Sequence, residues 1–544
     1  MKKILDEINF ATAWEKVAEV VPESPALSYD GRRISWKDFE ERAAGLANFL
    51  NSFGLSLNSK VALYCYNGPE YSEAQFATLK IRAIPANVNY RYLDNELAYI
   101  LENADAEAIF FDHTLSERVE KARKQCSNLK VAIQVGGEEV ADWAVSYKQA
   151  VRSSLMSPIK RSCEDLWFLY TGGTTGRPKA VMWTHRALLE GMKDSFNSLG
   201  EEVPTSLDEV RIITKRIATE SRQMHQLPAA PLMHGTSGLP ALFTHTHGGL
   251  VVTMTSKNFD AEEFWQTVER EKVTMVTLVG DAFARPMIEA LDKAASEKQF
   301  PDLKSLRLIL SSGVMFSTPL KERLLQHHRC TIVDTLGSSE GASMGKQVTS
   351  RSRKGEGTAK FVLGEETRVF TEDGRDVQPG SNERGRLALG SPIPEGYYKD
   401  PEKTEKTFPT IQGKRWSIPG DWAMVEEDGS ITLLGRGSEC INTGGEKVYP
   451  EEVEEALKLN TFIADCNVVG TDDEKWGQAV VAVLELNCPA PIDVEVLRED
   501  VRTRLAGYKI PKKFIFVEKI LRSPNGKSDY KWARKVVEKS KKDI

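Results

Sequence analysis

The amino-acid sequence predicts an α/β protein with two parts. The first is a large N-terminal body of several packed subdomains, made of sheets and helices; the second is a small α+β C-terminal domain. Short apolar runs alternate with segments in which apolar residues recur at helical spacing, and this alternation continues to about Leu434. Beyond Leu434, a glycine-rich stretch precedes roughly one hundred residues with a different order of elements, which is enough for a separate small domain.

In the body, helices are expected over residues 14–21 and 36–53, where apolar residues follow helical spacing. Buried strands are expected in the apolar runs at residues 60–66, 106–111, 166–170, 273–280 and 306–313. Each of the last two runs ends in glycine and is followed by a helical pattern. This order is typical of the strand–helix alternation in layered α/β folds.

The C-terminal domain is expected to contain two helices and three strands. The helices are expected at residues 451–458 and 494–505, and the strands at 464–469, 479–486 and 513–517. The preceding segment, residues 435–450, is rich in glycine and turn-forming residues. We therefore divide the chain into a body over residues 1–434, a connecting segment over 435–438 and a C-terminal domain over 439–544.

Two polar segments interrupt the pattern of the body. Residues 350–357 (SRSRKGEG) are polar and glycine-containing, as in a loop. A longer insert, residues 201–222, is either a lid or a surface decoration, and its polarity favours decoration.

The composition excludes several function classes. The chain has 544 residues and a net charge of −6, which gives no reason to expect nucleic acid or an anionic membrane as the main partner. No apolar run approaches the length of a membrane span, and the first residues lack the pattern of an export signal. The seven cysteines are scattered and form no C-x-x-C pair, so free thiols in a cytoplasmic protein are expected, without a zinc site.

The most informative motif is TGGTTGRPK, residues 171–179, which follows the apolar run at 166–170. Its glycines, Gly172, Gly173 and Gly176, allow a tight turn that presents backbone N–H groups. The hydroxyls of Thr171, Thr174 and Thr175 add hydrogen-bond donors, and Lys179 adds a positive charge. This combination suits a polyphosphate, although it is not the G-x-x-x-x-G-K-[ST] loop of the P-loop proteins.

This motif resembles the phosphate loop of the adenylate-forming superfamily, which includes acyl-CoA synthetases. The motif LGSSEG, residues 336–341, is similar to a second segment of that family. The resemblance implies that Glu340 helps to hold Mg²⁺ and that Ser339 contacts phosphate, with Gly337 and Ser338 beside them. Leu336 stands where the family has an aromatic residue that stacks on adenine. A carboxylate is a suitable ligand for a cation that bridges phosphate oxygens.

Further motifs follow in the order of the family. In WSIPGDW, the resemblance makes Asp421 the ligand of both ribose hydroxyls, which a carboxylate can accept as two hydrogen bonds. The resemblance makes residues 435–438 the hinge of a small mobile α+β C-terminal domain, residues 439–544, with the pivot near Ser438. Arg436 would contact ribose or phosphate at this hinge. Gly444 and Gly445 would line the passage for the thiol arm of CoA. In SPNGKSDYK, Lys527 matches the lysine that enters the site for adenylation.

Three weaker features complete the resemblance, which covers the chain from about Phe10 to Lys535. PLMHG places His234 near the acyl pocket, as a third candidate catalytic residue beside Glu340 and Lys527. The backbone of Ser312, Gly313 and Val314 would flank adenine. Small residues in the acyl-pocket segments, at Gly235, Gly238 and Gly280, leave room for a large group.

The family resemblance implies an ATP-dependent acyl-CoA synthetase that uses ATP, Mg²⁺ and CoA. The expected acid is a medium- or long-chain fatty acid or a bulky steroid side-chain acid, and a homodimer is considered as the assembly. One alternative is an adenylating enzyme that passes its acyl group to a carrier protein or to oxygen. Another is a nucleotide-binding scaffold without activity, which the retention of Glu340, Asp421 and Lys527 disfavours.

Overall fold

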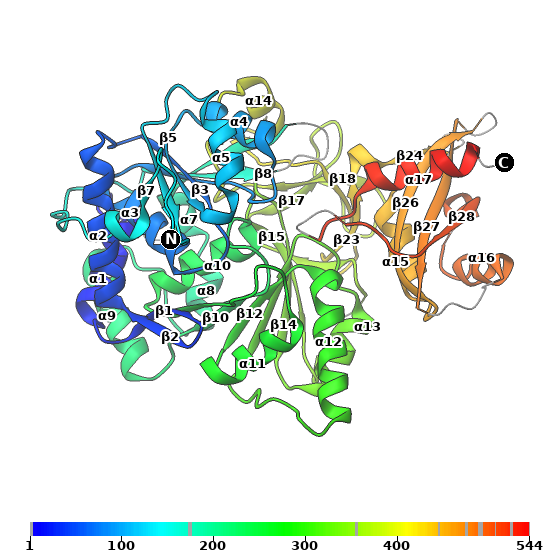
Figure 1. The fold of residues 1–544 in the computed structure, drawn as a ribbon. Coiled ribbons are helices and arrows are strands. Elements are labelled where there is room, and N and C mark those ends of the chain that lie inside the picture. The colour runs from blue at the N-terminus through cyan, green and yellow to red at the C-terminus, as the bar shows by residue number, and fades with distance from the viewer. Residues whose placement is uncertain are drawn as a thin grey trace.

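A computed structural model describes residues 4–171, 177–353, 357–443, 446–473, 477–487, 493–505, 507–522 and 526–542. The chain forms a mixed α/β body and a smaller domain at its C-terminal side (Figure 1). The fold class predicted from the sequence is therefore confirmed. Among the described residues, no helix is both long and apolar enough to cross a membrane.

The largest sheet of the body has thirteen strands. The strands from β1 to β14 in this sheet pair in parallel, except for the β1–β2 hairpin, and those beyond β14 pair antiparallel. In sheet order the strands are β17 (Thr367–Phe370), β18 (Arg384–Leu389), β22 (Asp421–Val425), β23 (Ile431–Arg436), β16 (Lys360–Leu363), β15 (Ser343–Thr349), β14 (Thr331–Gly337), β13 (Leu308–Ser312), β12 (Met275–Leu278), β10 (His225–Pro228), β11 (Leu250–Thr253), β1 (Pro25–Tyr29) and β2 (Arg32–Ser35).

A second sheet of eight strands lies beside it, and a short hairpin accompanies the two sheets. The eight strands, in sheet order, are β19 (Gly396–Tyr397), β9 (Lys179–Thr184), β8 (Leu166–Thr171), β4 (Ile84–Asn87), β3 (Lys60–Tyr64), β5 (Ala106–Asp112), β6 (Val131–Val135) and β7 (Val145–Ser146). The hairpin consists of β20 (Thr410–Ile411) and β21 (Lys414–Arg415).

Helices cover and connect these sheets (Figure 1). They are α1 (Phe10–Val20), α2 (Trp36–Ser52), α3 (Pro69–Lys80), α4 (Asp94–Asn103), η1 (His113–Leu115), α5 (Ser116–Arg123), α6 (Tyr147–Ala150), α7 (His185–Glu190), α8 (Lys193–Ser198), α9 (Leu207–Thr219), α10 (Gly235–Thr246), α11 (Ala261–Glu271), α12 (Gly280–Ser296), α13 (Thr318–His327) and α14 (Pro401–Thr407).

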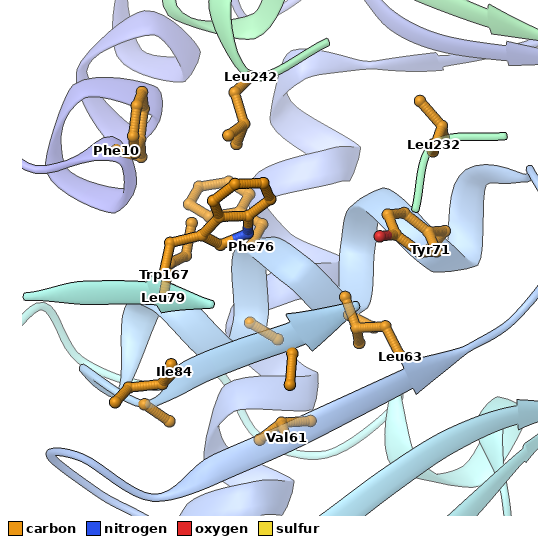
Figure 2. Close-up of a cluster of buried hydrophobic side chains, with 14 of the residues drawn as sticks. Phe10, Val61, Leu63, Tyr71, Phe76, Leu79, Ile84, Trp167, Leu232 and Leu242 are labelled. Carbon is orange, nitrogen blue, oxygen red and sulfur yellow. The ribbon is translucent and has the colours of Figure 1, made fainter. Parts of the chain in front are cut away.

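Helix α3 lies at the centre of the largest hydrophobic core. Every residue of α3 except Glu70 is buried, because α1 and α2 pack on one side and strands of the eight-stranded sheet lie on the other. Figure 2 shows Phe76 and Leu79 of α3 among side chains from α1, α10 and strands β3, β4 and β8. This core joins the two sheets of the body into one unit.

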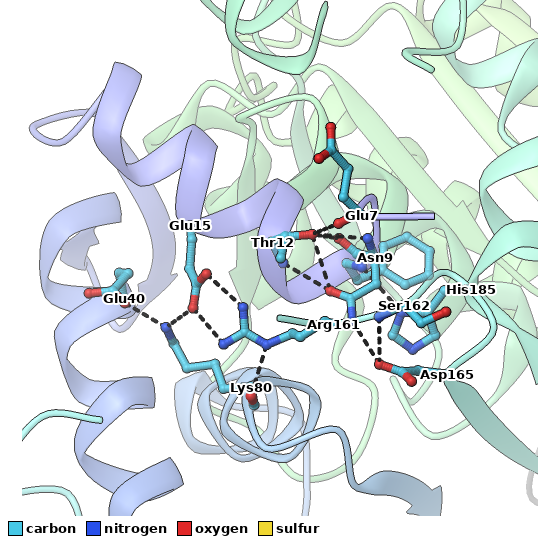
Figure 3. Close-up of polar contacts among 11 residues, drawn as sticks. Glu7, Asn9, Thr12, Glu15, Glu40, Lys80, Arg161, Ser162, Asp165 and His185 are labelled. Atoms are coloured by element: carbon cyan, nitrogen blue, oxygen red, sulfur yellow. Dashed lines mark hydrogen bonds and ion pairs between the residues drawn. The ribbon is translucent and has the colours of Figure 1, made fainter. Parts of the chain in front are cut away.

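A buried charge on α3 is neutralised by neighbouring helices (Figure 3). Lys80 Nζ lies 2.6 Å from Glu15 of α1 and 2.5 Å from Glu40 of α2. Arg161 donates to the other oxygen of Glu15 at 2.7 Å and to the Lys80 carbonyl at 2.8 Å. Buried charges are tolerated when they are paired and hydrogen-bonded in this way.

The insert at residues 201–222 contains helix α9, which the sequence did not predict. Ser206 caps the helix by accepting a hydrogen bond from the Glu209 amide at 3.2 Å. One face of α9 is buried, and the helix packs against α1. The interpretation of this insert as surface decoration is therefore incomplete, since its helix belongs to the packed body.

The C-terminal domain is a five-stranded sheet with helices. Its elements are β24 (Ile441–Thr443), β25 (Glu446–Val448), α15 (Pro450–Lys458), β26 (Ile463–Asp473), β27 (Gly477–Leu486), α16 (Val494–Arg502), η3 (Gly507–Lys509), β28 (Lys513–Val517) and α17 (Tyr530–Lys542). Between β23 of the body and β24 lies a short helical turn, η2 (Gly437–Glu439). Figure 1 shows this domain at one end of the body.

Candidate functional site

A cavity of about 1150 Å³ lies between the two sheets of the body and the C-terminal domain. Several of its lining residues stand at the carboxyl ends of strands: Thr171 ends β8, Ser312 ends β13 and Gly337 ends β14. Ligands of open α/β sheets commonly bind at this edge. The C-terminal domain contributes residues 527–531, so both parts of the chain form its wall.

The polar end of the cavity is joined to a mainly apolar region along α10 and the thirteen-stranded sheet. Leu239, Pro240 and Phe243 of α10 face this region from one side. Met275, Leu308 and Val333 of strands β12, β13 and β14 face it from the other. A long apolar recess that begins beside polar groups suits an acid with a polar head and a large apolar body.

The predicted phosphate loop connects two antiparallel strands. Thr171 lines the cavity and pairs in register with Lys179 at the start of β9. Gly172, Gly173, Thr174, Thr175 and Gly176 lie outside the described residues. The ammonium of Lys179 forms an ion pair with Asp400, and this hydrogen bond is the main cause of the lowered pKa of the Asp400 carboxyl. Asp400 also caps α14, so it fixes the direction of Lys179.

The adenine-flanking segment predicted at residues 312–314 is only partly on the cavity surface. Ser312 and Gly313 line the cavity, and Gly313 has a φ of +93°, which glycine adopts readily. Val314 is not among the lining residues. Its carbonyl oxygen instead lies 2.8 Å from where a Cβ of Gly280 would stand.

The LGSSEG motif places its residues in two environments. Gly337, Ser338 and Ser339 line the cavity, and the Trp183 indole donates to the Ser339 carbonyl at 2.9 Å. Leu336 instead packs against a hydrophobic cluster of the body and does not line the cavity. Leu336 has no aromatic ring and packs away from the cavity. It therefore does not supply the stacking on adenine that the family pattern has at this position.

Glu340 is buried and held by hydrogen bonds behind these serines. The Tyr397 hydroxyl donates to Glu340 Oε1 at 2.8 Å, and the Ser417 hydroxyl donates to the Glu340 carbonyl at 2.6 Å. No group of three or more histidine, cysteine or acidic side chains gathers as a metal site in the described part of the chain. A single carboxylate beside a phosphate site fits Mg²⁺, because this ion is commonly held by one or two carboxylates together with substrate phosphates.

His234 stands at the start of α10 and lines the cavity. Burial lowers its pKa to about 4, with further contributions from the nearby charges of Lys527 and Arg91. The imidazole is therefore neutral at pH 7. Its Nε2 atom is buried and has no hydrogen-bond partner among the described residues, so a ligand in the cavity could supply one.

Lys527 reaches the cavity from the C-terminal domain. The preceding residue, Gly526, lies so close to α12 that a Cβ there would stand 3.3 Å from Ala282 and 3.4 Å from Val279. The loop with Lys527 is thus seated directly on the body. Lys527 and His234 approach the same cavity from the two parts of the chain.

The predicted ribose and hinge residues are neighbours in the body sheet. Asp421 begins β22 and pairs in register with Arg436, the last residue of β23. Asp421 is not among the residues that line the cavity. Gly444 and Gly445, the predicted CoA residues, lie outside the described residues.

Only one of the three small residues expected in the acyl pocket lines the cavity, and that residue is Gly235. A Cβ on Gly238 would stand 2.4 Å from the Leu232 carbonyl oxygen, and one on Gly280 would stand 2.2 Å from that of Met315. Gly280 also has a φ of +51°. Close backbone approach therefore explains Gly238 and Gly280, rather than room for the acid.

Sequence reasoning missed three side chains that organise the site, namely Asn87, Tyr397 and Asp400. Asn87, at the end of β4, accepts a hydrogen bond from the Tyr170 amide at 2.8 Å and donates to the Met233 carbonyl, next to His234. Its position as a polar residue at the end of a buried apolar run was the available signal. Tyr397 and Asp400 had no comparable signal, because their partners are distant in the sequence.

The comparisons with known proteins agree with this geometry. The model of the family "AMP-binding enzyme" matches residues 14–398, and that of its C-terminal domain matches residues 452–527. A 3-oxocholest-4-en-26-oate–CoA ligase of Rhodococcus rhodochrous is 39% identical, over 97% of this chain and 95% of that protein. A medium/long-chain-fatty-acid–CoA/3-oxocholest-4-en-26-oate–CoA ligase of Mycolicibacterium smegmatis is 37% identical, over 98% of each.

Among solved structures, an anthranilate CoA ligase in complex with anthranoyl-AMP matches with a TM-score of 0.85. The match covers 99% of this chain and 98% of that one, at 20% identity, and shows that the folds agree. The chain belongs to the AMP-binding enzyme family, as an acyl-CoA synthetase of the adenylate-forming superfamily. It is thus an acid–thiol ligase, as the sequence motifs predicted.

Proposed function

We propose that this acyl-CoA synthetase activates a medium- or long-chain fatty acid or a bulky steroid side-chain acid. The observation that carries the proposal is the cavity of about 1150 Å³, in which the polar strand ends continue into the apolar recess along α10. The CoA ligases of Rhodococcus rhodochrous and Mycolicibacterium smegmatis, whose names give such acids as substrates, support the same class.

The reaction proceeds in two half-reactions. A carboxylate resists attack by a thiol because its oxygen is a poor leaving group. In adenylation, a carboxylate oxygen attacks the α-phosphorus of ATP and pyrophosphate leaves, which gives an acyl-adenylate. In thioester formation, the CoA thiolate attacks the acyl carbonyl carbon, the bond to the AMP oxygen breaks and AMP leaves. Both steps build up negative charge that preorganised donors stabilise.

Residues at and around the polar end of the cavity have distinct roles in adenylation. The loop at residues 171–176, Ser338 and Ser339 bind the phosphates, while Lys179 and Lys527 offset their charge. The backbone of residues 312–314 flanks adenine. Asp421 binds the ribose hydroxyls and Arg436 contacts ribose or phosphate. Glu340 would hold Mg²⁺, which supplies positive charge to the phosphate oxygens. Lys527 stabilises the charge that develops at the α-phosphate.

The second half-reaction uses other groups. Gly444 and Gly445 line the passage for the thiol arm of CoA, and the C-terminal domain turns about residues 435–438 between the steps. His234, neutral at pH 7, stands where the acid's head group enters. Its Nε2, which has no hydrogen-bond partner in the described part of the chain, is offered to that group. The enzyme works in the cytoplasm, which the free cysteines of the described chain support. The homodimer stays a prediction.

A substrate panel tests this function. The purified protein is mixed with ATP, Mg²⁺, CoA and one acid at a time: acetate, octanoate, palmitate or 3-oxocholest-4-en-26-oate. We expect acyl-CoA, AMP and pyrophosphate with the large acids and little product with acetate. The proposal would be overturned if none of the acids gave acyl-CoA. Acyl-adenylate that forms but is not transferred to CoA would favour transfer to a carrier protein.

A further inference from the structure

Two side chains of helix α12 contact the C-terminal domain where it docks on the body. Arg285 donates to the Ala464 carbonyl of β26 at 2.6 Å. Asp281 Oδ2 lies 3.8 Å from Nζ of Lys458, the last residue of α15. In each contact, the two paired residues are far apart in the sequence. The contacts therefore join the body directly to the C-terminal domain.

Asp281 also holds the segment next to the predicted adenine site. Its Oδ1 accepts a hydrogen bond from the Ser317 amide at 2.8 Å, and its own amide donates to the Met315 carbonyl at 3.0 Å. Asp281 is 6% exposed, and its Oδ2 has no hydrogen-bond partner among the described residues. The ion pair with Lys458 is formed by this same buried oxygen.

The partner of Asp281 belongs to a buried charge cluster that continues to the loop of Lys527. Lys458 Nζ lies 2.9 Å from Asp465, whose carboxylate also accepts from Arg522 at 2.6 Å. Although burial disfavours a charge on Asp465, Lys458 and Arg522 hold its pKa well below the usual range. Arg522 in turn donates to the Gly526 carbonyl at 3.2 Å, directly before Lys527.

We propose that Asp281, Arg285 and Lys458 are positioning residues for adenylation, which dock the C-terminal domain so that Lys527 enters the cavity. The inference rests on the two half-reactions of the proposed function. Because the cluster connects the segment at 315–317 to the Lys527 loop, loss of its charges disfavours the docked arrangement. Thioester formation needs the thiol passage instead of Lys527, so it does not depend on these contacts.

The test measures the two half-reactions separately in Asp281→Asn, Arg285→Ala and Lys458→Met. Asp281→Asn keeps the oxygen that accepts from Ser317, and Lys458 keeps Asp465 as a partner, so this change leaves no buried charge alone. Adenylation is followed as acid-dependent exchange of pyrophosphate into ATP. Thioester formation is followed from supplied acyl-adenylate and CoA. We expect adenylation to fall about tenfold or more, and thioester formation to stay within about twofold.

Two further variants serve as controls. Lys458→Arg keeps the positive charge and should retain adenylation near the wild-type rate. Arg323→Ala breaks a surface pair with Asp292 within the body, so neither half-reaction should change. Equal losses in both half-reactions, or no loss in adenylation, would overturn the inference. A wild-type protein that performs neither half-reaction would instead refute the proposed function.

Discussion

The hydroxyl of Tyr397 donates a hydrogen bond of 2.8 Å to Oε1 of Glu340, the carboxylate proposed to hold Mg²⁺. Both side chains are buried, so the hydrogen bond fixes one orientation of the carboxylate. Groups that orient a metal ligand commonly change metal affinity when they are removed.

Tyr397→Phe should therefore raise the Mg²⁺ concentration needed for half-maximal adenylation by about tenfold. The neighbouring Tyr398 donates to Asp105 instead, so Tyr398→Phe is a matched control. The measurement is the adenylation rate against Mg²⁺ concentration. Identical curves for both variants would show that the hydrogen bond does not orient Glu340 for the metal.

Lys527→Ala should lower adenylation by about 10²–10³-fold, because it removes a preorganised positive charge from the developing phosphate charge. Thioester formation from supplied acyl-adenylate should change much less. Lys535→Ala, an exposed lysine on α17, should leave both rates unchanged. Unchanged pyrophosphate exchange in Lys527→Ala would refute the role given to this lysine.

Leu239→Trp should shift the preference of the enzyme toward shorter acids. Leu239 lines the apolar recess, so a larger side chain there removes volume that a long or bulky acid needs. Each methylene group of the acid that is no longer buried loses about 0.8 kcal/mol of binding free energy. Several such groups together lower kcat/KM for palmitate by about tenfold or more. Ile212→Trp, at an exposed position of α9, is the control. Equal losses for octanoate and palmitate would mean that the recess does not select acid length.

The folded protein should lose stability steeply as the pH falls below about 6.5. Burial lowers the pKa of His185 to about 4 and those of His245 and His247 to about 3, so the folded state binds protons later than the unfolded state. Their contribution to stability is complete above the unfolded pKa and is lost as the pH falls toward the folded pKa values. Between its unfolded and folded pKa values, each histidine lowers the free energy of unfolding by about 1.4 kcal/mol for every unit by which the pH falls.

Urea unfolding between pH 7 and pH 5 measures this effect. Replacing one of the three, by His245→Phe, should make the dependence on pH shallower, since a group that titrates only on unfolding is gone. His327, which pairs with Asp292 at the surface, is the control position for His327→Gln. A pH dependence unchanged by His245→Phe would contradict the assignment.

Local patterns predicted β26, β27, β28, α15 and α16 of the C-terminal domain, but not β24, β25 or α17. The strand expected at 513–517 is β28, and the helix expected at 451–458 is α15 with one added residue, Pro450, which suits the first turn of a helix. Helix α9 was missed because its polar flanks dominate the insert, although its apolar residues recur at helical spacing. The spacing of apolar residues therefore predicts individual helices and strands. The order of strands in a sheet depends on pairings between distant segments, which no local pattern contains.

The motifs identified candidate residues of the site, but not the side chains that hold these residues in position. Glu340 and Lys179 were identified from motifs, but their partners Tyr397 and Asp400 lie 57 and 221 positions away in the chain. Such contacts arise only when the sheets pack. For the same reason, Gly238 and Gly280 were interpreted as open space, although they allow backbone segments to approach closely.

The cavity wall includes residues 527–531 of the C-terminal domain, and this affects how tightly the enzyme binds its acid. An acid meets the complete binding surface only in molecules whose second domain is docked. The apparent dissociation constant then equals the intrinsic one divided by the docked fraction. Acid affinity measured on the whole enzyme thus reports a domain equilibrium together with the fit of the acid, and a variant that never touches the acid can weaken its binding.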